Sequence, residues 1–421
     1  MKKLFYIIFF FLCLIITNHI ISKGGFLNDY FVNKNVFKKD EPFYSRKLES
    51  SGWLKFRYGH SVIVIPITIS GHRVDAILDS GATRTIVSTS LSNSLGILHR
   101  GYTKGIGFGG VLKGSEVVTN VAIGIGRMRF LSTPVVASMP INDFGPLHEG
   151  RVRLILGVSI FKHTAVEIDY KSQKIRFFNS KSIAPPPGMI KLPIKLIDGA
   201  IVFPLAIEDQ PTRYFVLDTG DNENISVRYK YWKNKINILS KSINSSVSIV
   251  NNGKISIKYY LQRGDIGLSS GKNGDAFKFH NWPIRFYIKN ESTLVHDSVS
   301  GYIGNHFLDS FLLVVDYPQR RAFLEPNSTS FQIFVHDVIG IVPDEINGHV
   351  RALVVYPGSP AATAGLRAGQ IITAINGAPI SSAHQLWDLE THATLGTKFK
   401  ITLDDSTTRD LVASAPADWI H

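Results

Sequence analysis

The chain has 421 residues, which is enough for roughly two or three domains. Hydrophobic residues make up 44% of it and aromatic residues 11%, so it has enough apolar material for large cores and is not a disordered chain. The formal net charge of +13 favours contact with anionic surfaces, but lysine and arginine are scattered and form no nucleic-acid-binding motif. We therefore expect no nucleic-acid partner.

The first 22 residues have the pattern of an export signal. Lys2 and Lys3 precede an apolar run over residues 4–16, and small residues follow around Ser22. A retained membrane anchor is the alternative, because residues 4–21 are only slightly shorter than a typical span. Cys13, the only cysteine, lies in this segment, so we expect neither disulfides nor thiol catalysis in the rest of the chain.

Residues 23–51 are polar with interleaved aromatic residues. They serve either as a spacer or as a segment that packs on the following domain, and the sequence does not decide between the two. Short apolar strands separated by glycine-rich turns begin at about residue 52.

A long internal repeat occupies the centre of the chain, over residues 52–180 and again over residues 191–326, with a proline-rich connector at 181–190. We call these two units the first repeat and the second repeat. Each contains an apolar run that ends in Asp-(Ser/Thr)-Gly, then an apolar-apolar-Gly, and an Asp-Tyr pair 12 residues after that glycine. The members of the two sets are Asp79, Ser80, Gly81 and Gly157, and Asp218, Thr219, Gly220 and Gly304.

Two aspartates delivered to one place can carry out acid–base chemistry. Carboxyl groups held within about 3 Å cannot both ionise, so they share a proton. The neutral member can then donate to a carbonyl oxygen while the ionised member takes a proton from water. We expect Asp79 and Asp218 to form such a pair, with glycine at Gly81 and Gly220 permitting the turns.

These paired motifs, over residues 52–327, resemble those of the retropepsin-like and pepsin-like aspartic peptidases, and residues 304–308 and 314–318 are similar to bacterial members. The resemblance implies a mainly β fold with two homologous β-barrel lobes, a cleft between them, and an aspartic endopeptidase that acts on protein or peptide substrates. It implies that Ser80 and Thr219 support the catalytic loops and that Gly157 and Gly304 pack behind them. It also implies a monomer that needs no cofactor or metal.

With the export signal, the resemblance implies a location in a bacterial periplasm or cell envelope, or outside the cell, and the alternative of a retained anchor adds a membrane tether through the first segment. The sequence departs from the family at Asp221, where alanine or serine is usual. A carboxylate there either raises the proton affinity of the pair and its working pH, or points to solvent or caps the turn.

The run 105–110 fits the G-x-G-x-x-G pattern of dinucleotide sites, but strand-like residues follow it where such a site needs a helix. We predict a hairpin, either a plain surface hairpin or the flap of an aspartic protease with Phe108 at its tip. The histidines show no metal-ligand spacing, and no metal site is expected.

Residues 331–417 form a further unit that resembles the PDZ domains of bacterial envelope proteases, on the basis of a short helix ended by glycine in 357–366 and a strand and turn in 367–377. The resemblance makes Ile339, Gly340 and Ile341 the loop that captures C-terminal peptides. The alternative is a PDZ domain that docks on the protease. Two rivals of the endopeptidase remain: a catalytically silent peptide-binding protein, and a latent protease blocked by residues 1–50 or by the PDZ domain.

Overall fold

The computed structural model describes residues 43–44, 49–59, 62–82, 84–97, 99–107, 110–118, 121–131, 136–139, 152–180, 189–197, 199–233, 243–250, 253–269, 275–288, 298–327, 338–346 and 348–414. The predicted signal or anchor at 1–22, most of the segment 23–51, most of the connector 181–190, and Phe108 lie outside these residues. Among the described residues, no helix has the length and apolar character needed to cross a membrane.

The first repeat, together with residues 43–44 of the preceding segment, forms an eleven-stranded sheet, with β1 at one edge and β7 at the other. Its strands, in sheet order, are β1 (Phe43–Tyr44), β10 (Met128–Leu131), β9 (Ile123–Ile125), β4 (Val62–Ile69), β5 (His72–Leu78), β12 (Val152–Leu156), β6 (Thr85–Ser88), β11 (Val136–Met139), β8 (Gly110–Val118) and β7 (His99–Gly107), with β3 (Arg57–Gly59) paired to β4. Two short helices accompany it, α2 (Thr89–Ser94) and α3 (Val158–Phe161). Buried and more exposed positions alternate in β12, which places one of its faces in the core, whereas β4 is buried at most of its positions.

The second repeat forms an eight-stranded sheet with the same central topology. Its strands, in sheet order, are β16 (Lys195–Ile197), β17 (Ala200–Ile207), β18 (Arg213–Leu217), β23 (Gly301–Ile303), β19 (Ile225–Val227), β22 (Asp275–Tyr287), β21 (Gly253–Ser269) and β20 (Ile243–Val250), and α4 (Tyr229–Trp232) and α5 (Asn305–Leu308) accompany them. Strand β18 runs parallel to β23 as β5 runs parallel to β12, and β19 is antiparallel to β23 as β6 is to β12. The sequence repeat is therefore a structural repeat in these central strands.

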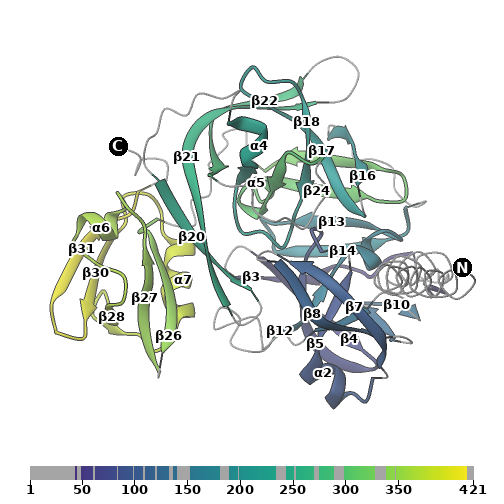
Figure 1. Cartoon of the computed structure of the whole chain (residues 1–421), viewed down its shortest axis with the longest axis horizontal. Helices are drawn as coiled ribbons and strands as arrows, with labels where there is room; N and C mark the ends of the chain where they lie inside the picture. The colour runs from purple at the N-terminus through teal and green to yellow at the C-terminus, as the bar shows by residue number, and fades with distance from the viewer. Residues whose placement is uncertain are drawn as a thin grey trace, which may run out of the picture.

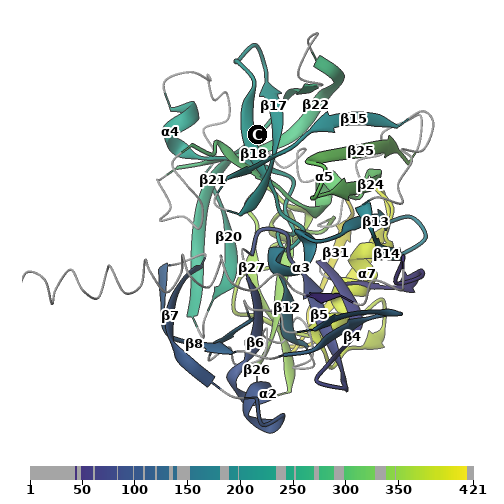
Figure 2. The same cartoon turned by 90° about the vertical axis from the view of Figure 1, so that its right-hand side faces the viewer.

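A third sheet takes strands from both repeats. Its six strands are β15 (Ile190–Pro193), β25 (Arg321–Pro326), β24 (Phe311–Asp316), β13 (Ala165–Asp169), β14 (Lys174–Phe178) and β2 (Leu54–Lys55). The two repeats meet where β13 pairs antiparallel with β24, with Glu167 opposite Val314. Figures 1 and 2 both show β13 and β14 between the sheet that contains β4 and β5 and the sheet that contains β17 and β18.

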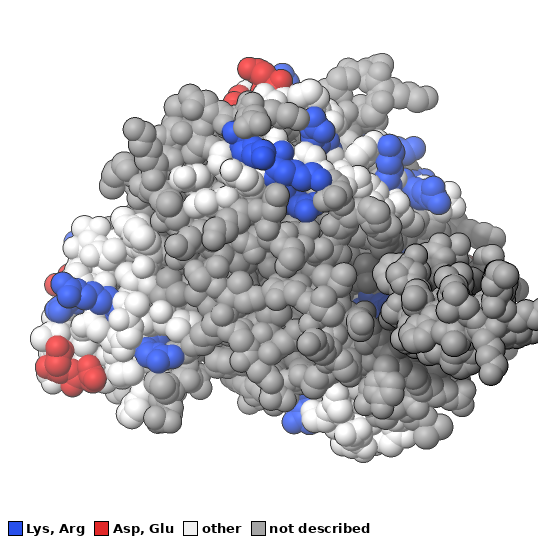
Figure 3. All heavy atoms as spheres, in the orientation of Figure 1, with Lys and Arg blue, Asp and Glu red and all other residues white. Residues whose placement is uncertain are grey.

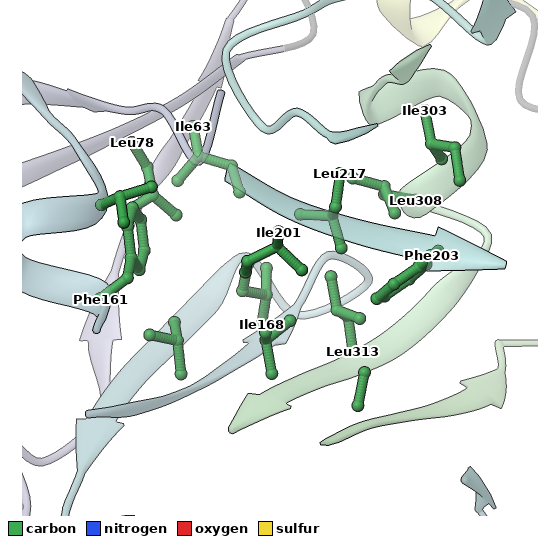
Figure 4. Close-up of a cluster of buried hydrophobic side chains, with 14 of the residues drawn as sticks. Ile63, Leu78, Phe161, Ile168, Ile201, Phe203, Leu217, Ile303, Leu308 and Leu313 are labelled. Atoms are coloured by element: carbon green, nitrogen blue, oxygen red, sulfur yellow. The ribbon is translucent and has the colours of Figure 1, made fainter. Parts of the chain in front are cut away.

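One hydrophobic core runs through both repeats and the sheet that they share. Leu78 and Phe161 from the first repeat and Leu217 and Ile303 from the second belong to the same buried cluster, and Ile168 on β13 lies among them in Figure 4. This continuity ties the ends of β5 and β18, where the candidate aspartates follow, to a single packed interior.

The C-terminal residues form a separate six-stranded sheet, drawn in yellow-green to yellow in Figure 1. Its elements are β26 (Ile341–Ile346), β27 (His349–Val355), β28 (Ile371–Ile375), β29 (Ala378–Pro379), β30 (Lys398–Leu403) and β31 (Thr408–Val412), with helices α6 (Pro360–Thr363) and α7 (Ala383–His392). Ser382 and Gln385 begin α7 with a reciprocal capping box. This unit has its own core, which includes Ile339, Leu386 and Ile401.

The prediction of a mainly β protein with barrel-like sheets and a PDZ domain is confirmed. Lysine and arginine lie in several separate groups on the face shown in Figure 3, with no continuous basic surface among the described residues there.

Candidate active site

Each candidate aspartate follows a buried strand of its repeat. Asp79 comes directly after β5 and its backbone N–H donates to the carbonyl of Leu156 on β12, at 3.0 Å. Asp218 comes directly after β18 and its N–H donates to the carbonyl of Ile303 on β23, at 2.9 Å. These two hydrogen bonds extend the parallel strand pairing by one residue into each loop. They therefore fix the backbone position of each aspartate.

The two loops are joined by a reciprocal set of hydrogen bonds between Ser80 and Thr219. The N–H of Ser80 donates to Oγ1 of Thr219 and the N–H of Thr219 donates to Oγ of Ser80, each at 3.0 Å. The Ser80 hydroxyl also donates to the carbonyl of Leu217 at 2.8 Å, and the Thr219 hydroxyl to that of Leu78 at 2.9 Å. Both side chains are buried, so these bonds hold the loops in one relative position.

Glycine is required in both loops because each backbone lies against the carboxyl group of the other repeat. A Cβ atom on Gly81 would clash with the carboxylate of Asp218, and one on Gly220 would clash with that of Asp79. The structure therefore brings the carboxyl groups of Asp79 and Asp218 together, each against the glycine of the opposite loop.

The glycines behind the loops also lie in close contact with them. A Cβ on Gly157 would clash with the carbonyl groups of Arg84 and Ala82, and one on Gly304 would clash with those of Glu223 and Asp221. Gly157 and Gly304 precede α3 and α5 and occupy equivalent places. A larger residue at either position would displace the loop that carries the aspartate.

The two carboxyl groups have different surroundings. Oδ1 of Asp79 accepts from the N–H groups of Gly81 and Ala82, at 2.9 and 2.8 Å. Oδ1 of Asp218 accepts from the N–H of Gly220 at 3.0 Å, whereas the N–H of Asp221 donates to the backbone carbonyl of Asp218. Because hydrogen-bond donors favour an ionised carboxylate, Asp79 is the better stabilised anion.

The pKa shifts agree with this asymmetry. Burial raises the pKa of Asp79, and the bonds from Ala82, Asp218 and Gly81 oppose the rise. Burial, then the charge of Asp79 and then that of Asp221, raise the pKa of Asp218 well above its usual range. When the pair holds a single proton, the hydrogen bonds and the direction of these pKa shifts both favour protonated Asp218 and ionised Asp79.

The surroundings of Asp221 agree in part with both alternatives that the sequence left open, a cap of the turn and a charge that raises the proton affinity of the pair. Its Oδ1 caps the loop by accepting from the N–H of Glu223 at 3.0 Å. The side chain does not point to solvent, because Oδ2 is buried and has no hydrogen-bond partner in the part of the chain that the structure describes. Its charge also raises the pKa of Asp218, which is the effect expected of a nearby third carboxylate.

Sequence reasoning missed Asn305, which links the repeats beneath the site. Nδ2 of Asn305 donates to the carbonyl of Thr219 at 2.7 Å, and its Oδ1 accepts from the hydroxyl of Tyr170 at 2.9 Å. Beside it, the hydroxyl of Tyr58 donates to Asp309 at 3.1 Å. The available signal was a polar residue after Gly304, where the first repeat has Val158 after Gly157.

The hairpin and the predicted peptide-binding loop are described only in part. Strands β7 and β8 pair antiparallel up to Gly107 and Gly110, so strand β8, not the helix a dinucleotide site requires, follows the glycine-rich run.

In the PDZ domain Ile339 and Ile341 are fully buried, and the carbonyl of Gly340 accepts from the N–H of Tyr356 at 2.9 Å. Strand β26 pairs only with β27 among the described strands and is an edge of its sheet. In the same described residues, no group of histidine, cysteine, aspartate and glutamate is arranged to hold a metal.

Comparison with known proteins identifies two domains. Residues 65–160 match a family model described as an aspartyl protease, and residues 351–389 match one described as a PDZ domain. Among solved structures, the crystal structure of basic 7S globulin from soybean is similar, with a TM-score of 0.38 and 9% sequence identity over 66% of this chain and 95% of that chain. No protein of curated function matches the chain.

Proposed function

We propose that this chain, which carries an aspartyl protease domain and a C-terminal PDZ domain, is an aspartic endopeptidase. The observation that carries the proposal is the pair Asp79 and Asp218, on two loops locked together by Ser80 and Thr219. Because both halves of the site come from one chain, a single copy supplies both carboxyl groups, and we propose that the protein works as a monomer.

The unequal surroundings of the two aspartates suggest their roles. The ionised Asp79 takes a proton from a water molecule, whose oxygen attacks the carbonyl carbon of a peptide bond. Asp218 gives its proton to the carbonyl oxygen, so that a neutral tetrahedral diol forms and the site now holds one proton, on Asp79. When the C–N bond breaks, that proton goes to the leaving amine and a diol hydroxyl returns its proton to Asp218, which restores the starting site.

The test is peptide cleavage by residues 25–421 and by Asp79→Asn and Asp218→Asn variants. Each sample is incubated with a mixed peptide library from about pH 3 to about pH 8 and analysed by mass spectrometry. We expect cuts by the wild type that disappear in both variants, because Asp79→Asn removes the group that takes the proton from water and Asp218→Asn removes the group that protonates the carbonyl oxygen. Asp209→Asn, at an exposed turn between β17 and β18, is the matched control and should cleave normally.

Two other outcomes have clear meanings. Cuts that persist in both variants would refute the role of the pair. Silence in every sample would favour a latent enzyme or a catalytically silent peptide-binding protein. Chains lacking residues 1–50 or 331–421 distinguish these, because cleavage by either truncated chain shows that the missing segment blocks the site.

Two further proposals concern the PDZ domain and the location of the protein. The edge strand β26 lies beside α7 and provides a place where an added peptide strand would pair, and Ile339–Gly340–Ile341 would receive its C-terminus. Pro343 within β26 has no N–H, which removes one bond from such a strand. Export to a bacterial envelope or beyond, with or without a membrane tether, rests on the pattern of the first 22 residues.

A further inference from the structure

Asp221 is held rigidly beside the catalytic pair. Its N–H donates to the carbonyl of Asp218 at 3.2 Å, and its own carbonyl accepts from the N–H of Asn305 at 2.8 Å. Its side chain is fixed at one oxygen by the N–H of Glu223 and leaves Oδ2 buried without a partner among the described residues. The equivalent residue of the first repeat is Ala82, so this carboxyl group is present on one side of the site only.

Among the described residues, no positively charged group that faces Asp221 forms an ion pair with it. Glu223 lies on the same loop and forms an ion pair with Arg285 on β22. Arg285 also lies over the ring of Tyr259, 4.4 Å from its centroid. Tyr287 on β22 and the carboxyl groups of Asp79 and Asp218 complete these surroundings, and no ion pair to Asp221 is seen in the described part of the chain.

We propose that Asp221 is a third titrating carboxyl group of the site, a positioning residue that acts through Asp218 and extends peptide cleavage toward neutral pH. This inference rests on the proposed endopeptidase function. At acidic pH Asp221 is protonated and neutral, and the Asp79–Asp218 pair retains its shared proton. Near neutral pH Asp221 ionises, in the range where the pair would otherwise lose that proton.

The electrostatics give the direction of the effect. Burial, with the charge of Glu223 next in importance, raises the pKa of Asp221 from 3.8 to about 7, and Arg285 opposes the rise. Once ionised, Asp221 adds a negative charge beside Asp218 and raises the pKa of that carboxyl further. The proton on Asp218, which the reaction needs, is therefore retained to a higher pH than the two catalytic aspartates alone would allow.

Asp221→Asn tests the proposal because asparagine keeps the shape and the oxygen that accepts from Glu223. The pH dependence of kcat/KM is measured for a peptide that the library identifies, with Asp209→Asn as control. We expect the basic limb of the profile to move to lower pH by about one unit in Asp221→Asn, with rates in acid preserved. A basic limb that coincides with that of the wild type would overturn the proposal.

A second measurement does not need activity. The free energy of unfolding in urea is compared between wild type and Asp221→Asn from about pH 4 to about pH 8. Between 3.8 and about 7 the native Asp221 holds a proton that the unfolded chain has lost, so this group contributes a fall in stability with rising pH that the variant lacks. Equal slopes would contradict the inference itself. If the slopes of unfolding free energy against pH differ but the protein cleaves no peptide, the proposed function is refuted while the titration of Asp221 is supported.

Discussion

Two tyrosines at equivalent positions of the repeats have unequal partners. Tyr170 donates to Asn305 in the second repeat, whereas the hydroxyl of Tyr317 is buried and has no hydrogen-bond partner among the described residues. The difference follows from the residue after the supporting glycine, which is Asn305 in one repeat and Val158 in the other. Burial raises the pKa of both hydroxyls well above the usual range, so neither ionises near neutrality.

Substitution by phenylalanine should therefore change the free energy of unfolding differently at the two positions. Tyr170→Phe leaves Asn305 Oδ1 without its buried donor and should lower the free energy of unfolding by about 2 kcal/mol. Tyr317→Phe removes an unpaired buried hydroxyl and should leave stability unchanged or slightly higher. Urea unfolding of the two variants measures this, each serving as the control for the other. Equal losses of unfolding free energy in the two variants would show that the hydrogen bond from Tyr170 to Asn305 does not contribute to stability.

At the scale of elements, the sheet shared by the repeats decides whether each can fold alone. Strand β13 of the first repeat pairs along its whole length with β24 of the second, from Ala165 opposite Asp316 to Asp169 opposite Leu312. Separation of the repeats would expose both strand edges and the apolar faces of the common core.

We predict that residues 25–184 and 185–327, expressed separately, are insoluble or unfolded, and that together they form a folded complex. Circular dichroism and size-exclusion chromatography report folding and association. The intact 25–327 chain is the control, because it retains the shared sheet. Two fragments that each fold as monomers would show that the shared sheet is dispensable.

At the scale of the whole molecule, the cores of the protease and PDZ parts are distinct clusters of buried residues. A domain with its own core can unfold independently, so heating should give two transitions instead of one. Calorimetry of residues 25–421, compared with 25–327 and 331–417, should show each isolated part melting near the corresponding transition of the longer chain. A single transition, lost in both shorter chains, would mean that the two parts stabilise each other.

Much of this protein is readable from the sequence, because the relevant signals are local. Alternating apolar residues predict strands, the paired Asp-(Ser/Thr)-Gly motifs identify two carboxyl groups with the small residues that surround them, and the glycine-bounded helix and strand after residue 357 predict the PDZ domain. The sequence also singled out Asp221 as unusual but left its surroundings open.

By itself, then, the sequence determined the β-rich class of the fold, the duplication and the two candidate aspartates, since each depends on spacing along the chain. Only the tertiary structure decided how the two halves differ. Oδ1 of Asp79 accepts a second N–H, and Oδ2 of Asp221 is buried near the Glu223–Arg285 pair. Hydrogen bonds also link Tyr170 through Asn305 to Thr219. Each of these features depends on the tertiary arrangement. Burial and hydrogen bonding shift a carboxyl pKa through the three-dimensional arrangement of neighbouring groups, which no local pattern records.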